Sequence, residues 1–127
     1  MRGVKIIKLN LLKKDDRGFI FEFENRNSSK LLLIKRKKDT VSGGHYHTGK
    51  SKMKNPETVI ILDGKAKVVL KNVKTKEKLI KTFNKPVMFK IDPYIYHKIE
   101  ALTDIILLDM NSIDDDKGDT VRGLKLR

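Results

Sequence analysis

The sequence of 127 residues contains no cysteine and no tryptophan. The absence of cysteine excludes disulfides, thiolate nucleophiles and cysteine-based metal sites, so any metal must be bound through nitrogen and oxygen. No apolar run approaches the roughly 20 residues that a membrane-spanning helix needs, and the N-terminus lacks the apolar stretch of a signal peptide. We therefore expect a cytoplasmic protein that has no membrane segment.

Acidic residues are scarce relative to basic ones, with 16 Asp and Glu against 29 Lys and Arg and a formal net charge of +13. Such a balance favours anionic partners. The lysines are spread along the whole chain, which is more typical of a well-solvated surface than of a binding stripe. The sequence lacks zinc-finger spacing, a helix-turn-helix pattern and a base-stacking aromatic motif. We therefore expect a small anionic substrate, and neither nucleic acid nor membrane as a partner.

Turn residues separate many short runs with strand character, whereas helical periodicity is almost absent. The pattern predicts an all-β sandwich or barrel of about ten short strands in a single domain over residues 1–127. We place its core at about residues 18–110. An N-terminal strand within residues 1–17 precedes the core. A polar tail, residues 111–127, follows it and is either loosely ordered or packed against a partner subunit.

Three local patterns predict particular structures. Asp63-Gly64 predicts a tight hairpin between strands at 57–62 and 65–73. The unbroken apolar run at 31–34 predicts a strand that is covered on both faces. The lysine-rich loop at 48–56, punctuated by glycine and proline, predicts a mobile flap over a neighbouring site.

The three histidines of the chain occupy two short stretches. In a strand, residues two apart point to the same face, so His45 and His47 can direct both imidazoles inward. Glu57 opens an apolar run, where a buried carboxylate is costly unless it is paired or ligated. His97 could add a fourth group from a distant strand. Two alternatives remain open, namely that Glu57 pairs with a lysine and that the histidines are hydrogen-bonded core residues.

The order of these residues resembles the two motifs of the cupin superfamily. Residues 43–47, Gly-Gly-His-Tyr-His, are followed by Glu57 and, after six residues, by Gly64, as in the first motif. Pro93 and His97 resemble the second. The resemblance implies a small double-stranded β-helix, or jelly-roll, barrel that covers most of the chain.

The cupin resemblance also implies a metal site. Its ligands would be His45, His47, Glu57 and His97. This donor set suits a divalent transition metal such as zinc, iron, manganese, nickel or copper. The sequence departs from the usual motif because nine residues, instead of three or four, separate His47 from Glu57. Tyr94 also stands where a glycine is expected.

A narrower resemblance is to cupins that act on nucleotide-linked keto sugars. Residues 16–19, Asp-Arg-Gly-Phe, followed by Glu22, are similar to the opening of the dTDP-sugar 3,5-epimerases and 3,4-ketoisomerases. The resemblance implies proton abstraction next to a carbonyl, with His45 as the base. It also implies Arg17 as a phosphate or sugar contact, although this arginine could equally pair with a turn aspartate. Tyr94 is a candidate substrate contact that could instead be a packing or rim residue.

Three positions depart from the epimerase pattern. Glu57 stands where the epimerases have a lysine, His47 replaces a glutamine, and Ser42 or Gly44 replaces an arginine. These changes exchange a cation that stabilises an oxyanion for a set of metal ligands. We therefore expect a relative of the epimerases in which a metal polarises the carbonyl.

Three classes of function remain open on the sequence. The first is an isomerase or epimerase-like enzyme that acts on an anionic sugar or sugar nucleotide. The second is an iron-dependent cupin oxygenase, and the third is a noncatalytic module that binds a small ligand or a metal. We also expect a homodimer, because small barrels of this kind commonly pair through edge strands.

Overall fold

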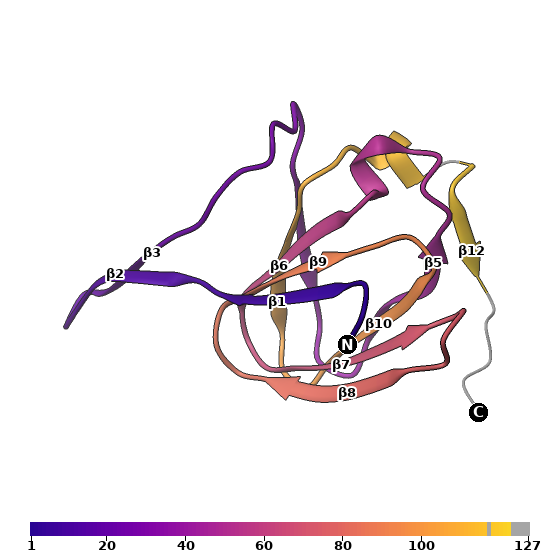
Figure 1. The fold of residues 1–127 in the computed structure, drawn as a ribbon. Helices are drawn as coiled ribbons and strands as arrows, with labels where there is room; N and C mark the ends of the chain where they lie inside the picture. The colour runs from indigo at the N-terminus through magenta and orange to yellow at the C-terminus, as the bar shows by residue number, and fades with distance from the viewer. Residues whose placement is uncertain (117, 123–127) are drawn as a thin grey trace.

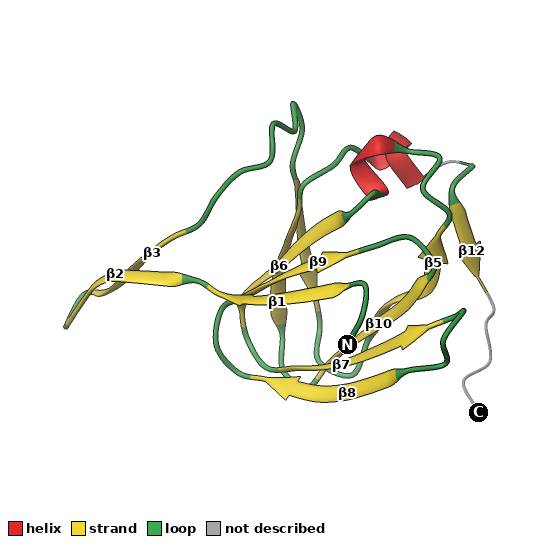
Figure 2. Cartoon of the chain, in the orientation of Figure 1, coloured by secondary structure: helices red, strands yellow, loops and turns green. Residues whose placement is uncertain are grey.

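The computed structural model describes residues 1–116 and 118–122, and within them two five-stranded antiparallel sheets form a sandwich (Figure 1). The strands of the first sheet, in spatial order, are β1 (Val4–Lys8), β9 (Val87–Ile91), β6 (Glu57–Asp63), β11 (Ile105–Asp109) and β4 (Leu32–Arg36). The strands of the second are β12 (Thr120–Arg122), β5 (Val41–His47), β10 (Ile95–Ala101), β7 (Ala66–Asn72) and β8 (Lys78–Phe83). Two short 3₁₀ turns, η1 (Lys52–Lys54) and η2 (Ile113–Asp116), lie side by side above one end of the sandwich (Figure 2).

From β4 to β12, most consecutive strands alternate between the two sheets, which is the winding of a jelly roll. The predicted all-β cupin fold is therefore confirmed. The alternating apolar residues of the strands meet between the sheets, where Ile61, Phe89 and Leu107 are buried in one large cluster. This core holds the sheets together, and the side chain of His45 lines a pocket that lies beside it, between the sheets.

The predicted hairpin at Asp63-Gly64 is wrong. Strand β6 pairs with β9 and β11, whereas β7 pairs with β8 and β10, so the turn carries the chain from one sheet to the other. Gly64 has φ +92, and a Cβ atom there would collide with the carbonyl oxygen of Asp104. The dipeptide therefore marks a tight corner of the jelly roll.

The prediction for residues 31–34 is also wrong in one respect. Strand β4 is an edge strand, and the side chain of Leu33 is 74% exposed in the single chain. Leu32 and Ile34 point to the opposite face and line the interior. An unbroken apolar run indicates burial on both faces, but only one face of this strand is covered by its own chain.

The loop at 48–56 is anchored, contrary to the predicted mobile flap. The carboxylate of Asp119 accepts hydrogen bonds from the backbone N–H groups of Thr48, Gly49 and Ser51 and from the Thr48 hydroxyl, at 2.6–3.0 Å. The Arg26 guanidinium donates to the Met53 carbonyl at 3.1 Å. The start and the middle of the loop are thereby fixed by Asp119, which immediately precedes β12, and by Arg26 of the β3–β4 connection.

The C-terminal tail is part of the barrel as far as Arg122. Strand β12 pairs with β5, and Asn111 is buried. These contacts overturn the expectation of a loosely ordered tail for the described residues. The rest of that predicted segment, residues 117 and 123–127, lies outside the described part of the chain.

The N-terminal segment forms two strands, of which β2 (Asn10–Asp15) pairs with β3 (Gly18–Glu22) in a separate hairpin. This hairpin extends away from the sandwich (Figure 1). Its apolar side chains Leu12, Phe19 and Ile20 are more than half exposed. The hairpin therefore offers a large apolar surface that its own chain leaves uncovered.

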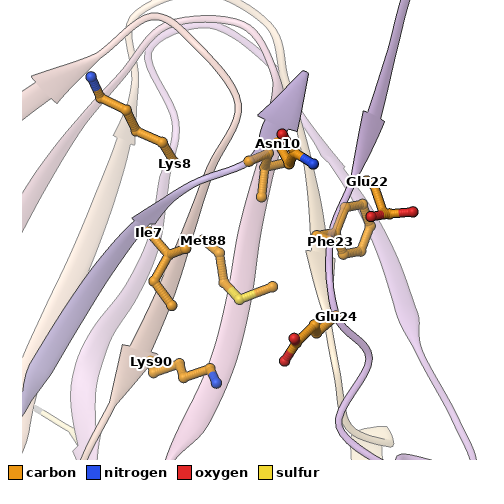
Figure 3. Close-up of a pocket in the computed structure, with 9 residues that line it drawn as sticks. Ile7, Lys8, Asn10, Glu22, Phe23, Glu24, Met88 and Lys90 are labelled. Carbon is orange, nitrogen blue, oxygen red and sulfur yellow. The ribbon is translucent and has the colours of Figure 1, made fainter. Parts of the chain in front are cut away.

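A cavity of about 610 Å³ lies where the hairpin leaves the first sheet (Figure 3). Ile7, Phe23 and Met88 form its apolar wall, and Glu22, Glu24, Lys8 and Lys90 lie around it. The cavity contains no histidine and is separate from the site described below. Among the described residues, no helix is long and apolar enough to cross a membrane.

Candidate active site

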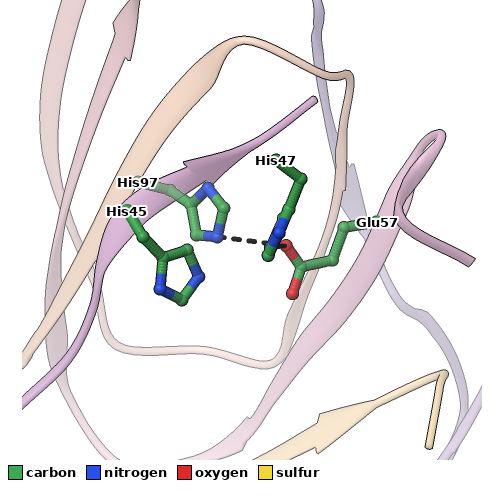
Figure 4. A group of neighbouring side chains, drawn as sticks. All are labelled: His45, His47, Glu57 and His97. Atoms are coloured by element: carbon green, nitrogen blue, oxygen red, sulfur yellow. Dashed lines mark ion pairs between the residues drawn. The ribbon is translucent and has the colours of Figure 1, made fainter. Parts of the chain in front are cut away.

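Three strands bring His45, His47, Glu57 and His97 together inside the barrel (Figure 4). Strand β5 contributes His45 and His47, β6 contributes Glu57, and β10 contributes His97, which lies directly opposite His45. All four residues are buried, and four potential ligand atoms, one from each, lie within 4.8 Å of one another. The longer loop before Glu57 therefore does not displace this carboxylate from the cluster.

The Glu57 carboxylate is the centre of the cluster. Its Oε2 atom lies 3.0 Å from Nε2 of His47 and 3.0 Å from Nε2 of His97. The other ring nitrogens have partners of their own, because His97 Nδ1 lies 3.0 Å from the Ile95 carbonyl and His47 Nδ1 lies 3.3 Å from the Thr120 hydroxyl. These outer contacts fix the rings so that both Nε2 atoms face the carboxylate.

The cluster fits a divalent transition metal. Four buried polar atoms, namely His45 Nδ1, His47 Nε2, Glu57 Oε2 and His97 Nε2, have no well-aligned hydrogen bond to the described residues. An imidazole that donates through Nδ1 carries a lone pair on Nε2, which would repel a carboxylate oxygen unless a proton or a metal lay between them. Three imidazoles and one carboxylate are a donor set that zinc, iron, manganese and nickel accept.

Lys54 is a site residue that sequence reasoning missed. Its side chain is fully buried, and Nζ lies 3.1 Å from Oε1 of Glu57, 3.1 Å from Oδ1 of Asn111 and 3.8 Å from Oδ2 of Asp109. The alternative in which Glu57 pairs with a lysine therefore holds, and it holds together with the histidine contacts. No sequence signal distinguishes Lys54 from the exposed lysines of the same loop.

The electrostatics of the cluster favour a charged Glu57 and a neutral His45. Burial alone would raise the pKa of Glu57, but His97, His47 and Lys54 together hold it well below its usual range. Burial lowers the pKa of His97, yet the Glu57 carboxylate outweighs burial and leaves that pKa raised. Burial, together with His97 and His47, lowers the pKa of His45 to about 3. His45 therefore has a free lone pair at neutral pH.

A pocket of about 390 Å³ gives access to the cluster. It is lined by His45, Glu57 and His97 and by apolar residues of β4 and β11. Two arginines that the sequence analysis did not select, Arg36 and Arg122, also line it. Ser42, at a position where the epimerase resemblance expects arginine, accepts a hydrogen bond from Arg36 Nε at 3.0 Å.

Two predicted substrate contacts lie outside this pocket in the single chain. Arg17 is at the tip of the β2–β3 hairpin, where it pairs with Asp15 at 2.9 Å, as the turn alternative proposed. Tyr94 has φ +65 and lies in the turn that precedes β10. Its N–H donates to the His47 carbonyl at 2.8 Å, which supports the cluster from outside.

The neighbouring Tyr96 is buried in β10. Its hydroxyl lies 3.7 Å from the position that a Cβ of Gly44 would take, beside His45. It therefore packs against the strand that carries the histidines.

A known protein family matches most of the chain. The model of a family described as the polysaccharide biosynthesis C-terminal domain matches residues 13–121. No curated protein matches the chain.

Many solved structures resemble the chain. The sugar 3,4-ketoisomerase QdtA from Thermoanaerobacterium thermosaccharolyticum, a double mutant in complex with TDP, is 25% identical with a TM-score of 0.75, covering 97% of this chain and 89% of that one. The TDP-quinovose 3,4-ketoisomerase WlaRB from Campylobacter jejuni is 19% identical with a TM-score of 0.72, covering 97% and 95%. The dTDP-4-dehydrorhamnose 3,5-epimerase from Sulfolobus tokodaii is 21% identical with a TM-score of 0.69, covering 98% and 74%.

Proposed function

The chain belongs to the polysaccharide biosynthesis C-terminal domain family, and from this premise we propose that it is an isomerase or epimerase acting on a nucleotide-linked keto sugar. Three observations support the proposal. QdtA was solved with TDP and with TDP-4-keto-6-deoxyglucose. The pocket of this chain has a size suited to a small ligand, and it carries two arginines that suit an anion.

The observation that carries the proposal is the position of His45 in the wall of this pocket. Its low pKa, about 3, leaves the imidazole neutral and able to accept a proton. A base beside a keto sugar can remove the proton from the carbon next to the carbonyl, which gives an enediolate. Protonation of the former carbonyl carbon, together with transfer of the hydroxyl proton from the oxygen of the first carbon to the oxygen of the second, moves the carbonyl. Protonation of the first carbon from its opposite face, by an acid on that face or by water, inverts that centre instead.

We also propose that His47, Glu57, His97 and His45 bind a divalent transition metal, such as zinc, iron, manganese or nickel. The buried ligand atoms that lack aligned hydrogen bonds support this proposal. When bound, the metal would act as a Lewis acid towards the substrate carbonyl. His45 then has two possible roles, as the fourth ligand or as the base, and a variant at this position separates them.

We propose that two chains associate as a homodimer. The exposed apolar side chains of the β2–β3 hairpin and of edge strand β4, including Phe19 and Leu33, support this proposal. Surfaces of this kind are costly in a monomer and typical of subunit interfaces.

Proton exchange tests the enzymatic proposal directly. The protein is incubated in D₂O with TDP-4-keto-6-deoxyglucose, and ¹H NMR follows the signals of the carbons next to the carbonyl. We expect deuterium to enter one of these positions with the wild-type protein and with Tyr46→Phe, which changes a ring on the opposite face of β5. His45→Asn should abolish the exchange. Binding of the nucleotide sugar without any exchange would contradict the proposal and favour a noncatalytic module.

A further inference from the structure

We infer that Lys54 is a positioning residue of the proposed metal site, because it holds one oxygen of Glu57 and leaves only the other oxygen to bind the metal. This role rests on the proposed function, since it concerns the metal that the cluster is proposed to bind. It makes Lys54 a determinant of which metal the site prefers.

The two carboxylate oxygens of Glu57 have different surroundings. Oε1 accepts a hydrogen bond from Lys54 Nζ at 3.1 Å. Oε2 lies 3.0 Å from Nε2 of His47 and 3.0 Å from Nε2 of His97. Within the described part of the chain, Oε2 has no well-aligned hydrogen bond. Oε2 is therefore the oxygen that faces the other potential ligand atoms, and Oε1 is turned towards the ammonium group.

The ammonium group of Lys54 is surrounded by oxygen atoms. Besides its bond to Glu57, Nζ donates to Oδ1 of Asn111 at 3.1 Å and lies 3.8 Å from Oδ2 of Asp109. The Lys54 side chain is buried, so the ammonium cannot exchange the Glu57 carboxylate for bulk water without a large cost. Oε1 therefore stays with Lys54 and is unavailable to a metal.

The backbone that carries Lys54 is also fixed. Lys54 is the last residue of η1, and its N–H donates to the Ser51 carbonyl at 3.1 Å. The Ser51 N–H donates to the Asp119 carboxylate at 2.9 Å, and Arg26 donates to the Met53 carbonyl at 3.1 Å. The side chain of Lys54 therefore enters the barrel from an anchored turn.

The number of oxygens that Glu57 offers affects which metal fits. With Oε2 alone, the cluster supplies at most three imidazole nitrogens and one carboxylate oxygen, a small set rich in nitrogen that suits zinc. With both oxygens, the carboxylate would add a further oxygen donor, and sites with more ligands and more oxygen suit manganese. Lys54 therefore favours zinc over manganese.

Two substitutions of Lys54 test this role. The affinities for Zn²⁺ and Mn²⁺ are measured by competition with a chelator for wild type, Lys54→Met and Lys54→Gln. Both variants remove the same charge, which affects the two divalent ions alike, but only the glutamine amide can still donate to Oε1. We expect the ratio of zinc to manganese affinity to fall about tenfold in Lys54→Met and to stay close to wild type in Lys54→Gln. Lys52→Met, at an exposed position of the same turn, should match wild type.

Infrared spectroscopy of the wild-type protein tests the same role without a variant. Glutamate is labelled with ¹³C, and the spectrum of the metal-free protein is subtracted from that of the zinc-loaded protein. A carboxylate bound through one oxygen separates its asymmetric and symmetric stretches more widely than one bound through both. We expect the wide separation for Glu57, and this result is independent of whether Lys54→Met folds.

The outcomes separate this role from the proposed function. The narrow separation in wild type would overturn the role of Lys54, and so would equal metal preferences in folded Lys54→Met and Lys54→Gln. In both cases the metal site itself would stand. If wild type binds neither metal, the proposed site and the role of Lys54 fail together. The enzymatic proposal is decided separately, by proton exchange.

Discussion

The ammonium group of Lys54 lies 3.1 Å from Oε1 of Glu57, and both side chains are buried. The second carboxylate oxygen, Oε2, faces His47 and His97. Glu57 therefore joins the loop at 48–56 to the cluster, because one of its carboxylate oxygens contacts Lys54 of the loop and the other contacts the imidazoles of the barrel. The loop is thus a structural part of the candidate site.

Removal of the Lys54 charge should destabilise the protein. Lys54→Met leaves Glu57 and Asp109 buried near one another without the ammonium that compensates them, and loss of one partner of a buried pair costs about 3 kcal/mol. We expect this loss in the free energy of unfolding, measured by urea denaturation. The double variant Lys54→Met/Glu57→Gln should recover part of it. Lys52→Met, at an exposed position two residues earlier in the same 3₁₀ turn, is the control. A change below about 0.5 kcal/mol in Lys54→Met would contradict the role of the pair.

Metal analysis should find a transition metal that depends on the cluster. We expect about one equivalent after reconstitution, measured by atomic spectroscopy, and a loss of affinity of at least tenfold in Glu57→Gln and His97→Asn, because each removes one donor. Tyr46→Phe should bind metal as wild type does. Less than about a tenth of an equivalent in the wild-type protein would refute the four-ligand proposal.

His45→Asn separates the two roles of this histidine. If His45 acts as the base, the variant retains metal and loses proton exchange. If His45 is a ligand, metal and exchange are lost together. The buried Nδ1 atom of His45, which has no aligned hydrogen bond to the described residues, is compatible with either role.

The sequence was sufficient for the strands and for the cluster, because both follow from local periodicity and motif spacing. His45 and His47 share a face since they are two residues apart, and both rings point into the barrel, as this spacing predicts. The sequence did not predict which strands pair with one another. Asp63-Gly64 specifies a tight reversal, but the choice between a hairpin and a corner depends on which sheet each flanking strand joins.

Sequence reasoning missed Lys54 and Arg122. The chain has many lysines and arginines, and only the tertiary structure places these two beside the cluster. Lys54 is one lysine of a lysine-rich loop, and its burial follows only from the turn at Lys52–Lys54. Arg122 belongs to a tail whose polar composition predicts that it is exposed to solvent. Its place beside His45 follows from the pairing of β12 with β5, a long-range contact that has no local signature.

Asp119 should make the stability of the protein depend on pH in the acid range. Burial raises its pKa, but hydrogen bonds from Thr48, Ser51 and Lys50 outweigh burial and lower it from the ordinary 3.8 to about 2. The charged carboxylate therefore stabilises the folded state above about pH 4. This contribution is lost as the pH falls through about 2.

Asp119→Asn tests that role at neutral pH. Because the carboxylate accepts several hydrogen bonds, we expect a loss of about 2 kcal/mol in the free energy of unfolding at pH 7. The difference from wild type should shrink at pH values approaching 2. Asp16→Asn, at an exposed turn, should show neither effect. A difference between Asp119→Asn and wild type that does not change with pH would contradict the assignment.

The exposed apolar residues predict an interface that charge should disrupt. Light scattering after size exclusion should give twice the chain mass of 14.7 kDa for wild type. Leu33→Asp, combined with Phe19→Asp, places two carboxylates on the apolar surface of β4 and the β2–β3 hairpin, and burial of such charges is costly. We expect this variant to be a folded monomer.

The control is Ile80→Asp, at an exposed isoleucine of β8, which is an edge strand of the other sheet. This variant should remain a dimer. A wild-type monomer at micromolar concentration would refute the dimer. A dimeric double variant would show that the interface lies elsewhere.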